Sequence, residues 1–204
     1  MKLVGSAPSP FVRKVLIVAF EIGVFDKIDR IFPKTTPTAP DNQLIRTNPL
    51  AKMPALIIQS GATLYDSRVI CEYLDSLHQG NRMFPEGLED RWKALRLQAL
   101  GDGLLDAAVS IRYETILRPQ NKYWPSWVEG QLGKVRRALD AIEREVDTFD
   151  DVVDIGTIAT ACAAGYLDFR FPEEEWRTLR PSLSGWYDEF SNRKSMMATE
   201  HTVT

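Results

Sequence analysis

The first 80 residues alternate short apolar runs with amphipathic segments. An apolar run at Lys2–Val4 predicts a strand, and apolar residues at helical spacing over Phe11–Ile22 predict a helix that stops at Gly23. A second strand-like stretch covers Phe25–Phe32. The segment that follows, Pro33–Asp41, is rich in Pro and Thr and is expected to form an exposed loop.

A hairpin and a further helix complete this half. Two apolar runs, Ala55–Ile58 and Ala62–Tyr65, surround a turn that contains Gly61, which predicts a β-hairpin. Ser67 then opens an amphipathic segment that predicts a helix. The element order is therefore βαβ, a connector and ββα, which indicates an α/β domain over residues 1–80.

The second half of the chain lacks strand signals. A polar stretch with Gly80, Pro85 and Gly87 is expected to link two domains. Beyond it, apolar residues recur at three and four positions in four segments: Arg91–Leu117, Trp127–Val146, Ile155–Phe169 and Leu183–Phe190. This pattern predicts an all-helical bundle domain over residues 88–204.

Composition narrows the class of protein. Hydrophobic residues make up 44% and charged residues 26% of the chain, which is typical of a folded globular protein. The net charge of -3 provides no basic field, so neither nucleic acid nor a membrane is an expected partner. No apolar run reaches the roughly 20 residues that a membrane span needs, and the start lacks the pattern of a secretory signal. We therefore expect a cytoplasmic protein.

The chain has too few cysteines and histidines for a disulfide framework or a metal site. Cys71 and Cys162 are too few for a disulfide framework, and both lie inside predicted helices, where buried thiols are the usual state. His78 and His201 have no cysteine or histidine neighbour at ligand spacing. No metal site is expected.

The most informative segment is Ser9-Pro10-Phe11, which opens the first helix. Serine followed by proline is an N-cap and a favoured first helical residue, and Ser9 could serve as a cap alone. The same helix start gathers unpaired N–H groups and a positive dipole end, which stabilise a nearby anion. Because a hydroxyl there can also donate to sulfur, the segment suits a thiol that must ionise before it attacks an electrophile.

Two other segments suit an extended peptide ligand. Pro54 must begin a strand or lie at its edge, and a cis bond before it would leave the Met53 backbone free to pair with such a ligand. Asp66 and Ser67 open a helix directly after the hairpin. They could act only as a cap, but a helix start with a hydroxyl suits a ligand carboxylate and a neighbouring acid suits an amine.

Together these segments, in this order, resemble the soluble glutathione transferase family over essentially the whole chain. The resemblance implies a thioredoxin-like first domain and a helical second domain with an electrophile pocket. It implies that Ser9 stabilises the glutathione thiolate and that the remaining glutathione contacts come from Lys52, Met53, Pro54, Asp66 and Ser67. Phe11, Arg112 and Tyr113 are expected to line the electrophile pocket. Glutathione would be the co-substrate, a small hydrophobic electrophile the second substrate, detoxification the role and a homodimer the assembly.

The positions of tyrosine, cysteine and serine in the chain distinguish between the types within this family. No tyrosine or cysteine lies near the first helix, which disfavours the types that depend on those side chains and leaves a serine type. Ser6 also follows the first strand, so it stays an alternative to Ser9. A glutathione-dependent isomerase or peroxidase, and a non-catalytic binding protein on the same scaffold, stay open as alternative functions.

One stretch departs from the family pattern. Family members usually open a buried helix with a capping box that ends in an acid, but the aligned stretch here begins at Asp154 and has Thr157 in place of the acid. We therefore expect the reciprocal half of the box to be weaker.

Overall fold

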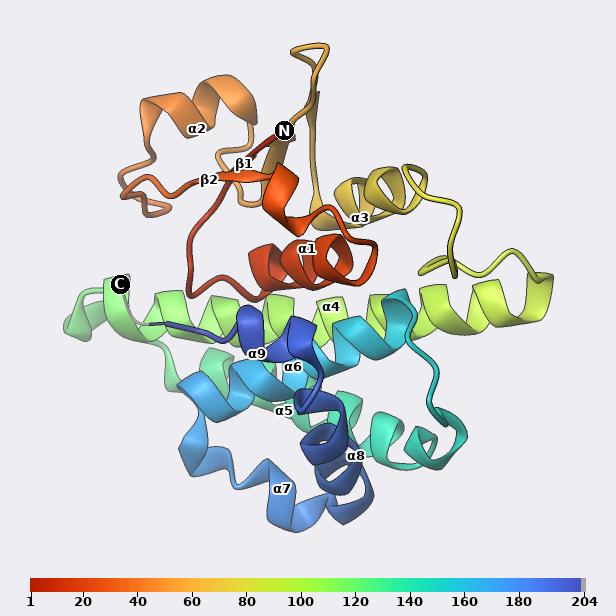
Figure 1. The fold of residues 1–204 in the computed structure, drawn as a ribbon. Helices are drawn as coiled ribbons and strands as arrows, with labels where there is room; N and C mark the ends of the chain where they lie inside the picture. Colours follow the sequence, from red (N-terminus) through yellow and green to blue (C-terminus); the bar gives the residue numbers. More distant parts are fainter. Residues whose placement is uncertain (203–204) are drawn as a thin grey trace. The chain divides into compact units, whose positions relative to one another are not determined.

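The computed structural model of the protein describes residues 1–202, which fall into two compact units (Figure 1). The first unit contains Met1–Leu88 and also the segment that begins at Lys194, and the second contains Glu89–Arg193. The expected domains were residues 1–80 and residues 88–204. The chain end departs from this division, because the last helix packs with the first unit.

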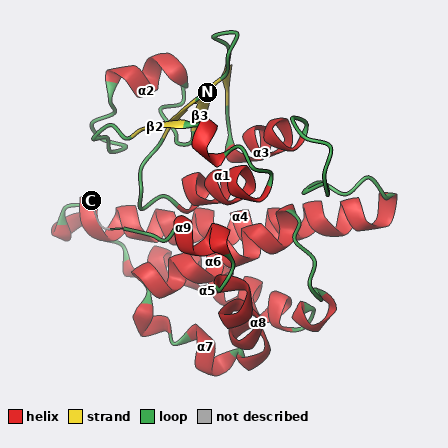
Figure 2. Cartoon of the chain, in the orientation of Figure 1, coloured by secondary structure: helices red, strands yellow, loops and turns green. Residues whose placement is uncertain are grey.

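A four-stranded sheet forms the centre of the first unit. Its strand order is β2-β1-β3-β4, with bounds Lys2–Val4 for β1, Asp29–Ile31 for β2, Ala55–Ile57 for β3 and Thr63–Leu64 for β4. β1 pairs in parallel with β2 and antiparallel with β3, and β3 pairs antiparallel with β4. Figure 2 shows that the strands, in yellow, lie in this part of the chain. The predicted strand over Phe25–Phe32 is only partly correct, because its first half is a 3-10 helix, η1 (Phe25–Lys27).

Two helices cover one face of this sheet and a third lies on the other (Figure 1). α1 (Pro10–Glu21) packs against α3 (Ser67–Asp75), and both were predicted. α2 (Asn42–Thr47), which contacts β3, was not predicted. It buries only Leu44 and Thr47, so its sequence has no helical repeat of apolar residues. It forms because the Asp41 carboxylate accepts hydrogen bonds from two N–H groups of its first turn.

The last helix, α9 (Lys194–Ala198), completes the first unit. It packs against α1, where the buried guanidinium of Arg13 donates to the Met196 carbonyl at 3.2 Å. The Ser195 hydroxyl donates to the Glu21 carboxylate at 2.5 Å. These contacts tie the end of the chain to the helix that carries Ser9.

The second unit is built from helices only, as predicted for this half of the chain. The principal helices are α4 (Leu88–Leu117), α5 (Pro125–Glu143), α6 (Ile155–Arg170), α7 (Trp176–Leu179) and α8 (Pro181–Ser191). Three 3-10 turns lie between them: η2 (Gln120–Lys122), η3 (Val146–Thr148) and η4 (Pro172–Glu174). Leu104, Leu105, Leu139, Ile142 and Ile155 are among its fully buried side chains.

The start of α6 has a complete capping box. The Asp154 carboxylate accepts from the N–H groups of Gly156 at 2.8 Å and Thr157 at 2.9 Å. In return, the Thr157 hydroxyl accepts from the Asp154 N–H at 3.0 Å. The reciprocal half of the box is therefore present, because the threonine oxygen reaches the same N–H that an acid would bind.

Replacement of Thr157 by valine is expected to lower the free energy of unfolding by about 1 kcal/mol, because the Asp154 N–H loses its partner. The control is Thr160→Val in the same helix. The Thr160 hydroxyl donates to the Gly156 carbonyl, so its removal leaves no N–H without a partner. Urea unfolding of both variants measures the difference, and equal losses would contradict the role of the box.

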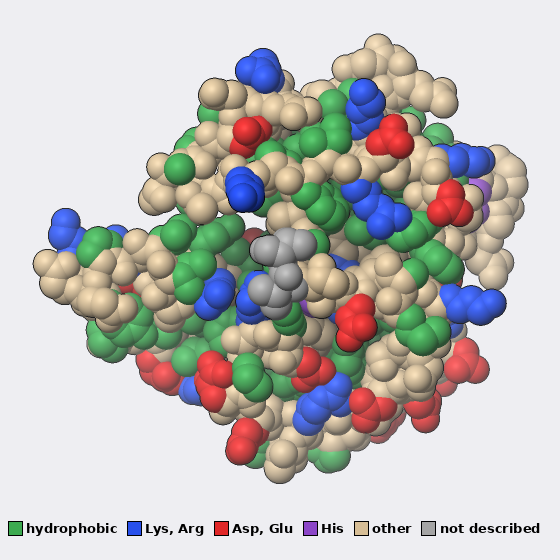
Figure 3. All heavy atoms as spheres, turned by 60° about the vertical axis from the view of Figure 1, so that its left-hand side comes forward, with side chains coloured by type: hydrophobic (Ala, Val, Ile, Leu, Met, Phe, Trp, Pro, Cys, Tyr) green, Lys and Arg blue, Asp and Glu red, His purple; other side chains and the backbone are tan. Residues whose placement is uncertain are grey.

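Charges are mixed on the surface. On the face shown in Figure 3, Lys and Arg side chains are interspersed with Asp and Glu. This agrees with the small net charge of -3. Within residues 1–202, no helix is both long and apolar enough to cross a membrane.

Candidate functional site

The topology brings three of the predicted segments to one end of the sheet. In the antiparallel pair of β1 and β3, Val4 lies opposite Ala55, so the chain leaves β1 where it enters β3. In the pair of β3 and β4, Leu56 lies opposite Leu64, the last residue of β4. The loop that leads to Ser9, the Met53–Pro54 segment and the start of α3 therefore share this end. Segments that are far apart in sequence therefore share one end of the sheet.

Ser9 caps α1. Its side-chain oxygen accepts from the Val12 N–H at 3.4 Å, and its carbonyl accepts from the Arg13 N–H at 3.0 Å. The Phe11 N–H has no partner in the described part of the chain, and no acidic residue occupies the first turn. The helix start therefore keeps its partial positive charge, and the Ser9 hydroxyl keeps its proton available for donation.

The Met53–Pro54 segment precedes β3, and its peptide bond is cis. The backbone N–H and carbonyl of Met53 form no hydrogen bond with any residue from 1 to 202. Pro54 is buried and Met53 is half-buried. One donor and one acceptor are therefore presented together, in the arrangement that an extended peptide needs.

Asp66 and Ser67 begin α3. One Asp66 oxygen accepts from the Arg68 N–H at 3.0 Å and the other from the Arg68 guanidinium at 3.1 Å. Asp66 therefore caps the helix and forms an exposed ion pair. Ser67 is 3% exposed, and its hydroxyl has no hydrogen bond within the part of the chain that is described. Because the cap belongs to Asp66, the Ser67 hydroxyl stays available to a ligand.

The remaining predicted residues differ in exposure. Lys52 is exposed, and its carbonyl is held by the Asn48 side chain at 2.8 Å. Ser6, the alternative to Ser9, is half-buried in the loop after β1, and its carbonyl accepts from the Ser9 N–H at 3.2 Å. Ser6 lies before the helix start rather than at it, so only Ser9 combines a hydroxyl with the helix dipole.

The residues predicted for the electrophile come from both units. Phe11 is half-buried and belongs to the first turn of α1, whereas Arg112 and Tyr113 lie in α4. Tyr113 is 38% exposed, and burial of the rest of its ring raises the pKa of its hydroxyl. Tyr166 and Arg170 of α6 interact electrostatically with Arg112, a grouping that the sequence analysis missed. Its sequence signal was the four-residue spacing of Tyr166 and Arg170, which places them on one face of a helix.

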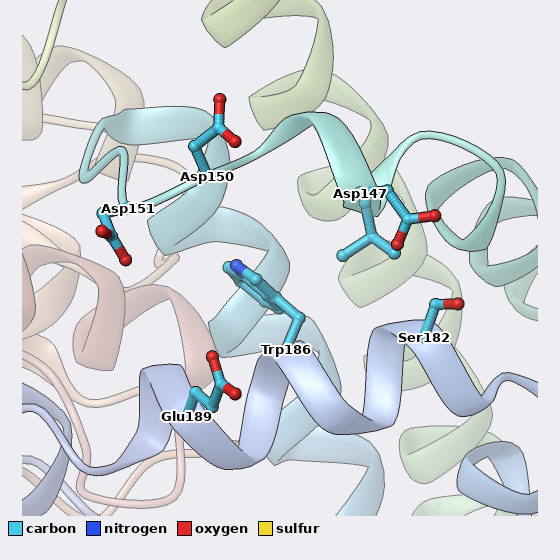
Figure 4. A pocket seen from close by; sticks show the side chains of 7 residues that line it. Asp147, Asp150, Asp151, Ser182, Trp186 and Glu189 are labelled. Atoms are coloured by element: carbon cyan, nitrogen blue, oxygen red, sulfur yellow. The ribbon is translucent and has the colours of Figure 1, made fainter.

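A separate pocket of about 420 Å³ lies in the second unit. Figure 4 shows that its lining comes from α8, from η3 and from the chain that follows η3, with four carboxylates around Trp186: Asp147, Asp150, Asp151 and Glu189. None of the predicted site residues lines it. Its acidic lining repels carboxylates, so it is unsuited to a ligand that carries them.

Comparison with known proteins agrees with this arrangement. Residues 8–77 match the family model of the glutathione S-transferase N-terminal domain, and residues 125–189 match that of the C-terminal domain. The chain is 35% identical over 205 residues to the uncharacterized GST-like protein YibF of Escherichia coli, with 98% of each sequence covered.

Solved structures are similar over the whole length. A glutathione transferase family member from Pseudomonas fluorescens Pf-5, with bound glutathione, is 45% identical with a TM-score of 0.97 and 99% of each chain covered. A second structure from that organism, with bound S-(propanoic acid)-glutathione, is 43% identical with a TM-score of 0.91 and all of each chain covered. The predicted fold class, a thioredoxin-like domain followed by a helical domain, is confirmed by these matches. By sequence and by structure alike, this chain belongs to the glutathione transferase family.

Proposed function

We propose that this protein is a glutathione transferase that binds glutathione in its first unit and ionises the thiol for attack on an apolar electrophile. One observation carries the proposal. The start of α1, with the Ser9 hydroxyl, and the free backbone groups of Met53 lie at the same end of the sheet. Relatives that are 45% and 43% identical were crystallised with glutathione or a glutathione derivative bound, which supports the same ligand here.

Each segment has a part in binding. The N–H and carbonyl of Met53, held in place by the buried Pro54, pair with the cysteinyl backbone of glutathione. The Ser67 hydroxyl and the start of α3 hold the γ-glutamyl carboxylate, and Asp66 attracts the γ-glutamyl amine. Asp66 also forms an ion pair with Arg68, so its carboxylate interacts with that guanidinium as well as with the γ-glutamyl amine. Exposed Lys52 is placed to meet the glycine carboxylate.

The chemistry needs a thiolate. The Ser9 hydroxyl donates to the sulfur, and the uncompensated start of α1 adds partial positive charge, so both favour the anion over the neutral thiol. The sulfur then forms a bond to the electrophile, and in a substitution the leaving group departs with the electron pair of the bond that breaks. We also propose a cytoplasmic homodimer, which sedimentation analysis would test.

The test combines retention on immobilised glutathione with turnover. We expect the protein to be retained, to be eluted by free glutathione and to conjugate chloronitroaromatic substrates. Retention without turnover across varied electrophiles would indicate a binding protein instead. Turnover only with hydroperoxides, or only with isomerisable substrates, would indicate one of the two other glutathione-dependent activities.

Ser67→Ala is expected to weaken glutathione binding about 10-fold, because one hydrogen bond to a charged carboxylate is lost. The pKa of the bound thiol should not change, since Ser67 is assigned to the other end of the tripeptide. Calorimetry measures the affinity, and Ser60→Ala, in the exposed hairpin turn, is the control. An unchanged affinity in Ser67→Ala would remove Ser67 from the site.

A further inference from the structure

Four side chains of the second unit form an aromatic and cationic cluster that the sequence analysis did not assemble. Arg112 and Tyr113 lie in α4, and Tyr166 and Arg170 lie four residues apart in α6. α4 and α6 pack in parallel where Gly101 faces Ala159, and Arg112 and Arg170 each lie 11 residues further along their helix, at the same level. The charge of Arg112 acts on Arg170 and on the Tyr166 hydroxyl, which agrees with this placement. Tyr166 is 3% exposed and Tyr113 is 38% exposed, so the cluster extends from the interior to the surface.

The cluster has positive charge without a matching carboxylate. Neither Arg112 nor Arg170 forms an ion pair with an acidic residue among residues 1–202. Arg118, Arg136, Arg177 and Arg180 of the same unit each pair with at least one acidic side chain. Arg112 and Arg170 differ in this respect from those four arginines.

Arg170 lies against an aromatic ring and has one buried N–H group without a partner among the described residues. Its guanidinium lies 3.9 Å from the centroid of the Phe169 ring, which orients its plane. Its Nε is buried and has no hydrogen-bond partner in the described residues. Burial, and then the charge of Arg112, lower the pKa of Arg170. An anion placed between the two guanidinium groups would supply the missing acceptor and offset their repulsion.

We propose that Arg112 and Arg170 bind a carboxylate on the second substrate, with the rings of Tyr113 and Phe169 beside its apolar body. This inference rests on the proposed transferase function and narrows its substrates from apolar electrophiles in general to those that carry a carboxylate. A carboxylate matches the planar donor fork of arginine and accepts from two N–H groups at once.

The test uses two electrophiles that differ in charge, a chloronitrobenzoate and the neutral chloronitrobenzamide. In each reaction the glutathione thiolate forms a C–S bond, the C–Cl bond breaks and chloride leaves. Arg170→Gln and Arg112→Gln are each expected to lower kcat/KM for the benzoate by about 10-fold or more, the effect of one lost charged hydrogen bond. In Arg170→Gln the kcat/KM for the benzamide should change by less than about 2-fold.

Three controls make the result specific. Arg144→Gln, an exposed residue at the end of α5, removes the same charge and should alter neither substrate. Arg170→Lys keeps the charge and should recover part of the benzoate activity. The KM for glutathione should be unchanged in all variants. Equal losses on both electrophiles, or a raised KM for glutathione, would overturn the proposal.

A binding measurement separates this proposal from the transferase function. Nitrobenzoate and nitrobenzamide have no leaving group, so calorimetry reports their binding without turnover. We expect wild type to bind nitrobenzoate about 10-fold more tightly than Arg170→Gln does, and to show no such difference for nitrobenzamide. If wild type binds nitrobenzoate in this way but conjugates neither electrophile, the transferase proposal fails and the carboxylate site stands. Arginine-independent binding of nitrobenzoate overturns the carboxylate site.

Discussion

Ser9→Ala is expected to raise the pKa of the bound glutathione thiol by about 1 to 2 units and to lower kcat/KM roughly 10- to 100-fold at neutral pH. A hydrogen bond from a hydroxyl to a thiolate stabilises only the ionised form, so its loss moves the thiol toward its ordinary pKa of about 8.5. The sign gives a second expectation. The difference in kcat/KM between wild type and Ser9→Ala should narrow as the pH rises above the thiol pKa of the variant, because both proteins then hold glutathione as the thiolate.

The measurement is a titration of the thiolate absorbance of bound glutathione, together with a pH profile of kcat/KM. Ser9 also caps α1, so alanine costs about 1 kcal/mol of stability, whereas glycine costs only a few tenths. Ser9→Gly should therefore reproduce the kinetic loss with little loss of stability, and Ser9→Thr should restore both properties. Ser6→Ala should titrate like wild type. An unchanged titration in Ser9→Gly, or a shift in Ser6→Ala, would assign the hydroxyl to another residue.

Gly156→Ala is expected to lower the free energy of unfolding of the second unit by about 2 to 3 kcal/mol. A Cβ at this position in α6 would lie 2.8 Å from the Ala94 carbonyl oxygen and 2.9 Å from the Leu97 Cβ in α4. Ala94 and Leu97 are buried, and the nearest atom is backbone rather than a flexible side-chain end, so the two helices must separate to admit a methyl group.

Gly103→Ala is the matched control. Gly103 lies in α4, is exposed, and has nothing within 4 Å of the position its Cβ would take. Alanine there should raise stability by about 0.5 to 1 kcal/mol, because glycine in a helix interior is unfavourable. Denaturant unfolding of the two variants should therefore show opposite signs. A stabilising Gly156→Ala would mean that α4 and α6 are not in close contact at this point.

The sequence predicts the parts of the fold that depend on local pattern. The hairpin around Gly61 and the helices that begin after Ser9 and at Ser67 were found because alternation, caps and turn residues are local signals. The pairing of Val4 with Ala55, which brings the three site segments to one end of the sheet, depends on strand order. The sequence supplied the residues of the candidate site, and the topology supplied their common location.

The rest depends on contacts between distant segments. The cationic cluster joins α4 to α6, and nothing near Arg112 in the sequence indicates that Arg170 is its neighbour. The short helix α2 has too few buried residues for a periodic signal. The place of α9 in the first unit depends on the hydrogen bond between Arg13 and Met196, which are separated by 183 positions.

The position of α9 has a consequence for biosynthesis. During translation the amino-terminal residues leave the ribosome first, but the helix that covers part of α1 is made after residues 89–193. The first unit can therefore be completed only after the second has been translated. A fragment cut at residue 88 would lack this helix, and a nascent chain would leave that side of α1 uncovered until α9 has been made.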